Sequence, residues 1–278
     1  MADLLTRIGL PEGSVAVIIS CDELGFCHAA NVAIFEAMRR RTTTSASLMV
    51  PAPWSRAATT DYRGEDVGVH LTLNSELELY RWAPITASPS LLDGDGAFPR
   101  TIDDIWAHAD LDEVRREWQA QIERAVLWGF NVNHLDAHLA GVELKPEFFD
   151  VYLDLADEFH LPVRLPALEE ERRIGFPFRA LAEERGIVAP DRVVSLLSLG
   201  SDAEEIASAL EALPPGLTEV HAHPALDTAE LRAATPAFAT RVAEAKLLEE
   251  LDALIESASA RRLHIVAYRD LHDLMTTP

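Results

Sequence analysis

Short apolar runs alternate along the chain with longer segments in which apolar residues recur every three or four positions. The short runs are rich in β-branched residues and predict strands at 15–20, 46–50, 67–73, 133–136, 163–165, 193–197, 218–222 and 264–268. The longer segments predict amphipathic helices at 29–40, 111–128, 146–159, 177–185, 203–213 and 237–257. The chain therefore reads as a series of strand–helix units.

Repeated strand–helix units predict mostly parallel strands joined by right-handed crossovers. About seven or eight such units fit a (β/α) barrel, and we expect an irregular or distorted one. A chain of 278 residues is long enough to form this barrel as one domain spanning 1–278. We therefore expect the α/β class and a TIM-barrel-like architecture.

One stretch interrupts the rhythm. Residues 79–100 read LYRWAPITASPSLLDGDGAFPR and are dense in Pro, Gly, Asp and Ser, which is typical of a loop. Loops of this length inside a compact domain are often functional. Because this loop follows the third predicted strand, we expect it to lie over the carboxyl ends of the strands, where the sites of barrel enzymes form.

Charge and cysteine content narrow the classes of partner and compartment. The chain has 46 acidic residues against 24 Lys and Arg, a formal net charge of −22, which disfavours binding to nucleic acids and anionic membranes. It shows neither an apolar run of transmembrane length nor a secretory signal at its start. Cys21 and Cys27 are too few for a disulfide framework, so we expect a cytoplasmic protein.

Polar residues cluster where four of the predicted strands end, at 21–25, 68–72, 133–138 and 219–224. Each cluster alone has a structural explanation, such as a turn, a helix cap or a hydrogen-bonded core histidine. Together they point to a site, because the carboxyl ends of parallel strands lie on one side of a sheet. Histidines and carboxylates bind a divalent cation and leave positions open for water. This predicts metal-assisted hydrolysis of an acyl or ester bond.

At these residues the sequence resembles the YdjC/ChbG-type (ChbG/HpnK) carbohydrate deacetylases, which are related to polysaccharide deacetylases. The segments that carry the resemblance are IISCDELG at 18–25, TSASLMV at 44–50, VGVHLTL at 67–73, HLDAH at 134–138, TEVHAHP at 218–224 and IVAYRDL at 265–271. The resemblance implies a barrel-like α/β fold, a divalent metal ion and removal of acetyl groups from N-acetylated sugars or short oligosaccharides.

The resemblance also implies roles for individual residues. Glu23, His70 and His138 match the metal ligands, Asp22 matches the general base and His223 matches a late histidine that acts as general acid. Asp136 is expected to support a metal ligand or a loop near the site. His134 and His221 are secondary candidates for the site.

Position 23 departs from the family pattern, because Glu replaces the usual Asp and reaches one methylene further. Asp22 and Glu23 are also consecutive, and in a regular strand their side chains would point to opposite faces. Both reach one site only if the backbone turns there, which Gly25 favours.

Two other functions stay open from the sequence. A metal-dependent phosphoesterase is disfavoured by the scarcity of Lys and Arg near the motifs, although Arg81, Arg100 and Arg164 keep it open. A non-catalytic sugar-binding barrel would have lost turnover through the Glu at position 23. The aromatic residues in and near the long loop suit either sugar stacking or packing; they are Trp54, Tyr80, Trp82 and Phe98. The sequence decides neither the sugar, nor the metal (zinc, magnesium or another), nor whether the protein is a homodimer.

Overall fold

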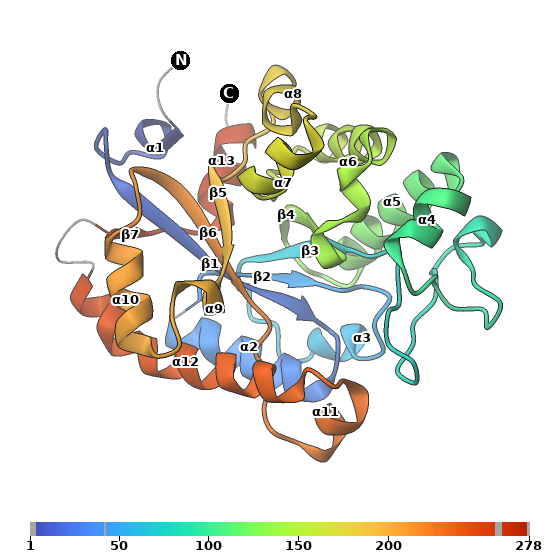
Figure 1. Ribbon diagram of the computed structural model, residues 1–278, viewed down its shortest axis with the longest axis horizontal. Helices are drawn as coiled ribbons and strands as arrows, with labels where there is room; N and C mark the ends of the chain where they lie inside the picture. Colours follow the sequence, from blue (N-terminus) through green and yellow to red (C-terminus); the bar gives the residue numbers. More distant parts are fainter. Residues whose placement is uncertain (1–3, 42, 259–262, 277–278) are drawn as a thin grey trace.

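One curled parallel sheet organises the computed structural model, which describes residues 4–41, 43–258 and 263–276. In this part of the chain the sheet has seven strands, β1 Val15–Leu24, β2 Ser45–Leu48, β3 Val67–Leu71, β4 Val132–Ala137, β5 Arg192–Ser195, β6 Gly216–Ala222 and β7 Leu263–Ile265. Their order is β4-β3-β2-β1-β6-β5, and β7 pairs with the first residues of β1. The predicted α/β class and parallel sheet are confirmed (Figure 1).

The sheet curls into an irregular, incompletely closed barrel, as predicted. Between its edge strands β4 and β5 runs the segment 162–164, which bonds to β4 through Leu135 and Arg164. On its other side Val163 donates a backbone hydrogen bond to Val188 at 3.0 Å. The predicted strand 163–165 is wrong, because it forms only the isolated bridge Leu135–Val163. Pro162 and a second proline four residues later flank it and cannot donate to a ladder.

Helices cover the outside of the sheet. The helices of the described residues are α1 Leu4–Arg7, α2 His28–Arg40, α3 Ser55–Ala58, α4 Ile102–His108, α5 Leu111–Leu127, α6 Pro146–Glu158, α7 Leu168–Ile174, α8 Phe178–Glu184, α9 Leu196–Leu199, α10 Ala203–Glu211, α11 Ala229–Ala234, α12 Phe238–Ala258 and α13 Tyr268–Thr276. Short 3₁₀ turns are η1 Pro89–Leu91, η2 His138–Ala140 and η3 Val142–Leu144. In Figure 1, α2 and α12 lie side by side along one side of the strands, and α5 and α6 pack together on another.

The six predicted helices all form, with ends within two residues of their predicted positions. The last predicted strand, 264–268, is partly wrong: β7 ends at Ile265, and Tyr268 begins α13. Residues 79–100 contain the single turn η1 and no other helix or strand. Among the described helices, none combines the length and the apolar character that crossing a bilayer requires.

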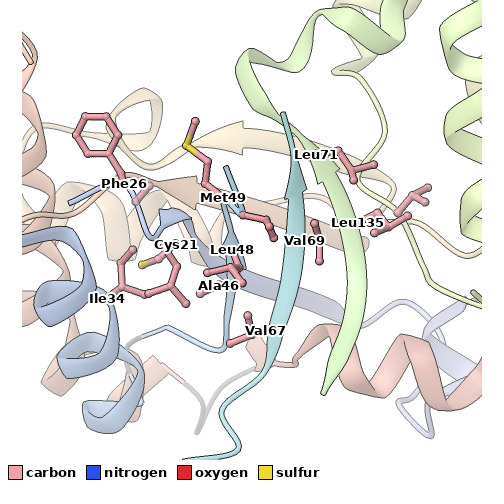
Figure 2. Packing of buried hydrophobic residues seen from close by; sticks show 14 of the residues in the cluster. Cys21, Phe26, Ile34, Ala46, Leu48, Met49, Val67, Val69, Leu71 and Leu135 are labelled. Atoms are coloured by element: carbon pink, nitrogen blue, oxygen red, sulfur yellow. The ribbon is translucent and has the colours of Figure 1, made fainter. Parts of the chain in front are cut away.

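Alternation along β1 divides the core into two parts. Val17, Ile19 and Cys21 face the helices, and Figure 2 shows Cys21 beside Ile34 of α2. The residues between them face the barrel interior, where Ile18 packs in a second apolar cluster. Each fully buried aliphatic side chain of this kind stabilises the fold by about 1.5–3 kcal/mol.

The second cluster fills the amino end of the barrel interior and is formed by Leu5, Ala16, Ile18, Val188, Leu217, Val266, Tyr268 and Leu271. We call it the lower plug. Above it the inward-facing positions turn polar, with Ser20 and Asp22 on β1 and Ser47 on β2, all buried. The same barrel interior is therefore apolar at one end and polar at the end where the strands finish.

Candidate active site

The end of β1 places two consecutive acidic side chains in one site. Asp22 and Glu23 are both buried, and the pairing of β1 with β2 shifts register between Cys21 and Leu24. Glu23 itself has a positive φ of 64°, so the backbone turns at this residue, two positions before Gly25. A non-glycine residue in this region costs roughly 1–2 kcal/mol. The expected turn is therefore present, and the strain lies on the acidic residue.

Gly25 is required for a different reason. A Cβ atom built on Gly25 would lie 2.8 Å from the Cα atom of Ser55, and its φ is 98°. The amide of Gly25 also donates a hydrogen bond of 2.7 Å to the side chain of Asn31 in α2. These contacts fix the chain directly after the two acidic residues.

Glu23, His70 and His138 come together with their donor atoms facing one another. Nε2 of His70 lies 3.2 Å from Nδ1 of His138, and Oε1 of Glu23 lies 3.5 Å from the same Nδ1. Two ligands of a tetrahedral zinc ion, each about 2.0–2.1 Å from the metal, lie about 3.3 Å apart. The donor set and its spacing therefore fit a divalent cation of this size.

Each of these histidines has a carboxylate on its other ring nitrogen. Nδ1 of His70 lies 2.9 Å from Oδ2 of Asp136, which also accepts a hydrogen bond from Ser47. Nε2 of His138 lies 3.1 Å from Oε2 of Glu76. Such partners orient metal-binding histidines and raise their basicity. Burial alone would lower the pKa of His70, but Asp136 outweighs it and raises this pKa to about 9.

Glu76 was not among the residues expected from the sequence. It follows β3 in the polar run Asn74-Ser75-Glu76, and the side-chain amide of Asn74 donates to it at 3.3 Å. The polar run after a buried strand was the available signal. Nothing in the spacing indicated that its third residue reaches His138.

Asp22 is held by Arg164. The guanidinium donates to both carboxylate oxygens of Asp22, at 2.6 and 2.7 Å, and also contacts Asp136 at 2.8 Å and Glu219 at 2.6 Å. Burial alone would raise the pKa of Asp22, but Arg164 outweighs it and holds this pKa well below its usual range. Asp22 is thus a carboxylate at neutral pH. A charged residue inside the apolar segment 161–166 was the sequence signal for Arg164.

A second arginine, Arg241 of α12, contacts Glu23. Its NH2 group donates to Oε2 of Glu23 at 2.5 Å, and its guanidinium lies 4.5 Å from the centre of the Phe26 ring. Burial alone would raise the pKa of Glu23, but Arg241 outweighs it and lowers this pKa to about 2. One oxygen of Glu23 is therefore held by Arg241 while the other faces His138. The helix pattern of α12 gave no sign of this contact.

The two histidines near the end of β6 face Asp22. Nδ1 of His221 lies 3.8 Å and Nε2 of His223 lies 3.7 Å from Oδ2 of Asp22. Their side chains are 27% and 31% exposed, whereas those of Glu23, His70 and His138 are at most 4% exposed. The His221 and His223 side of the site is therefore open to solvent. Burial lowers the pKa of His221 to about 4.

His134 lies in the core and not among the metal-capable groups. Its ring stacks on Tyr268 with centroids 3.9 Å apart, and its Nδ1 lies 2.8 Å from the side-chain oxygen of Asn133. Burial lowers its pKa to about 3, so it is neutral. The structural explanation of this histidine is the correct one.

The long loop lies over the site, as expected. The ring of Trp82 is 5.9 Å from that of His138, edge to face. Trp82 and Phe98 are buried, at 3% and 0% exposure, so both pack beneath the loop. Trp54 and Tyr80 are partly exposed, and the Tyr80 hydroxyl donates to the backbone oxygen of Phe26 at 2.6 Å. Packing explains the two buried aromatics, and the other two keep a face toward solvent.

The chain is similar to known proteins over most of its length. A family model described as YdjC-like protein matches residues 16–264. A carbohydrate deacetylase of Thermus thermophilus is 38% identical over 246 residues, 87% of this chain and 89% of its own length. One of Thermoanaerobacter pseudethanolicus is 26% identical over 86% of this chain and 92% of its own. A solved structure of a candidate cellobiose-phosphate cleavage protein from Enterococcus faecalis matches with a TM-score of 0.78 and 25% identity, covering 93% of this chain and 99% of its own.

Proposed function

This chain belongs to the YdjC-like family and is a carbohydrate deacetylase, and from this premise we propose its substrate class, metal site and acting residues. The substrate is an N-acetylated sugar or a short oligosaccharide, and the reaction is metal-assisted hydrolysis of its acetamide. One observation carries the proposal: Glu23, His70 and His138 present three donor atoms to one point, beside the ionised Asp22 and the partly exposed His223.

The metal is a divalent cation held by Glu23, His70 and His138, with zinc favoured by the donor types and spacing. When bound, such an ion polarises a carbonyl oxygen and acidifies water. Asp136 and Glu76 hold the two imidazoles in the orientation that points their free nitrogens at one another. Arg241 holds Glu23 so that a single carboxylate oxygen faces the histidines.

Asp22 acts as the general base and His223 as the general acid. Arg164 keeps Asp22 ionised, so this carboxylate accepts a proton from the attacking water but holds it weakly. The proton therefore has to move on, and Nε2 of His223 is 3.7 Å from the same oxygen. A protonated His223, on the open side of the site, then protonates the departing amine of the sugar.

The test is acetate release from N-acetylglucosamine and its short oligomers, measured with zinc, magnesium, manganese, cobalt or nickel added to metal-free protein. We expect His138→Ala to lose activity and metal binding together, while His108→Ala, which removes an exposed histidine on α4, retains both. Activity that survives both chelation and His138→Ala would contradict the proposal.

Among the described residues, the three arginines that kept a phosphoesterase open have other partners. Arg164 is bound to three carboxylates, Arg81 to Ser75, Asp93 and Phe98, and Arg100 to the backbone of Glu78. The alternative of a barrel that binds sugar without turnover is tested with the native protein. Acetate release by this protein, which has Glu at position 23, would exclude that alternative. We also propose a cytoplasmic location, which the free, buried thiols of the two cysteines support.

A further inference from the structure

A second group of metal-capable side chains lies beside the first. Oδ2 of Asp22, one ring nitrogen of His221 and one of His223 all lie within 4.8 Å of one another. His221 and His223 are two residues apart at the end of β6, so their side chains fall on the same face. Ser20 pairs with His221 in the parallel register of β1 and β6, which brings the next inward residue of β1, Asp22, beside His223.

His221 is the residue of this group that the deacetylase mechanism does not use. Its Nδ1 is buried and has no hydrogen-bond partner among the described residues, although it faces Oδ2 of Asp22 at 3.8 Å. A buried ring nitrogen without a partner is unusual, since buried polar atoms are nearly always satisfied. Oδ2 of Asp22 and the ring nitrogens of His221 and His223 therefore lie close together, and none of the described residues gives Nδ1 of His221 a hydrogen bond.

We propose that Asp22, His221 and His223 form a second site for a divalent cation, distinct from the one formed by Glu23, His70 and His138. Two imidazoles and one carboxylate select zinc, cobalt or nickel over magnesium and calcium. A carboxylate offers about four lone-pair positions, and Arg164 uses only one on each oxygen of Asp22, so Oδ2 retains one for a metal. The exposed edges of His221 and His223 let the ion arrive from solvent and leave positions for water.

The second site is weaker than the first and inhibitory. Arg164 places a full positive charge at 2.6 Å from Oδ2 of Asp22, which opposes a cation at that oxygen. The other site faces a guanidinium as well, but on the far oxygen of Glu23. An ion held by Asp22 and His223 occupies the proposed proton acceptor and proton donor at once. The predicted inhibition rests on the proposed function, whereas the predicted binding of a second ion rests only on the positions of Asp22, His221 and His223.

The experiment is a zinc titration of metal-free protein by equilibrium dialysis, with excess magnesium present to occupy surface carboxylates. We expect two zinc ions per chain in two steps, the weaker of which coincides with loss of acetate release. In His221→Ala and His221→Asn we expect the second ion to be lost. Its affinity should fall by more than the about 10–100-fold that follows from removing a group that only hydrogen-bonds a ligand. Inhibition by zinc should then require a correspondingly higher zinc concentration. His108→Ala is the matched control and keeps both ions.

Cobalt absorption separates the two sites. His138→Ala should retain only the cobalt spectrum of the second site, and His221→Ala only that of the first. A single zinc ion in the native protein across the inhibitory range, or a His221→Ala titration identical to the native one, overturns the proposal. Two zinc ions without any acetate release would refute the proposed function but support the second site. One zinc ion with full activity would support the proposed function and refute the second site.

Discussion

Both terminal nitrogens of Arg164 bind the carboxylate of Asp22 inside the barrel, at 2.6 and 2.7 Å. The same guanidinium reaches Asp136 and Glu219, so one cation holds three buried carboxylates. Charged groups in such a place are costly unless they are paired. The pair thus links the stability of the barrel to the protonation state of the proposed base.

Replacing Arg164 tests this link. In Arg164→Met, three buried carboxylates lose their counter-ion, and we expect the free energy of unfolding to fall by about 3–5 kcal/mol. Because Arg164 lowers the pKa of Asp22, its loss raises that pKa. As the pH falls, activity that needs ionised Asp22 is then lost at a higher pH than in the native enzyme, so the acid limb of the pH profile shifts upward. Denaturant unfolding and the pH profile of kcat/KM measure the two effects.

Arg164→Lys is the matched control, since it keeps the charge and removes the two-pronged contact. Its acid limb should lie between those of the native enzyme and the Met variant. An unshifted acid limb in a folded Met variant would show that Asp22 is not the proton acceptor.

Glu76 is expected to govern metal affinity through His138. Glu76→Ala removes the carboxylate from Nε2 of His138 and should weaken zinc binding by about 10–100-fold. Glu76→Gln keeps a hydrogen-bond acceptor for the ring and should recover most of the affinity. Competition with a chromophoric chelator measures the dissociation constants. Equal affinities in all three proteins would mean that the contact between Glu76 and His138 does not orient the ring.

Gly68 is expected to tolerate no side chain. A Cβ atom on this residue of β3 would lie 2.5 Å from the ring and the backbone oxygen of His134. In Gly68→Ala, β3 and β4 must move apart, and we expect a loss of about 1–3 kcal/mol, typical of overpacking. Thermal unfolding measures it. Gly94→Ala, in the exposed loop with nothing within 4 Å, is the control and should stay close to native. A native melting temperature in both would refute the close contact.

Asp66 lies at the amino end of the barrel, and its carboxylate should make stability depend on pH. Burial raises its pKa to about 6 despite hydrogen bonds from Ser45 and the backbone of Arg269. The native state therefore binds this proton more tightly than the unfolded chain. Protonated Asp66 therefore adds about 2–3 kcal/mol to the free energy of unfolding below pH about 4, and this stabilisation is lost as the pH rises through 6.

Asp66→Asn removes that titration. The difference in free energy of unfolding between the native protein and this variant should change with pH between about 4 and 6 and be constant above. Urea unfolding at a series of pH values measures it. A difference that is flat over the whole range would mean that Asp66 is ionised in the native protein at pH 4 as well.

Periodicity predicted the helices because each amphipathic helix buries one face, and short apolar runs predicted most strands because strands such as β1 are buried on both faces. The apolar runs failed at 163–165, where they suggested a strand but flanking prolines prevented the ladder. The strand-end clusters lie close together in the structure, with Glu23, His70 and His138 in one group, because the carboxyl ends of parallel strands lie on one side of the sheet.

The supporting groups could not be predicted in the same way. Arg164, Arg241 and Glu76 reach the site from an irregular segment, from the first turn of α12 and from a loop. Local patterns mark Arg164 and Glu76 as unusual polar residues, but they do not say which side chains the two contact. His134 was a secondary candidate from the sequence. In the structure its ring stacks on Tyr268, from the other end of the chain, and its Nδ1 lies beside the side-chain oxygen of Asn133, whereas His138 faces Glu23 and His70.

The lower plug has a consequence for traffic through the enzyme. Leu5, Ile18, Leu217 and the other residues of the plug close the amino end of the barrel. Among the described residues, the exposed edges of His221 and His223 therefore mark the side from which the proposed substrate and metal ion reach the site. If both use this side, a compound bound against His221 and His223 would block exchange of substrate, product and metal ion together.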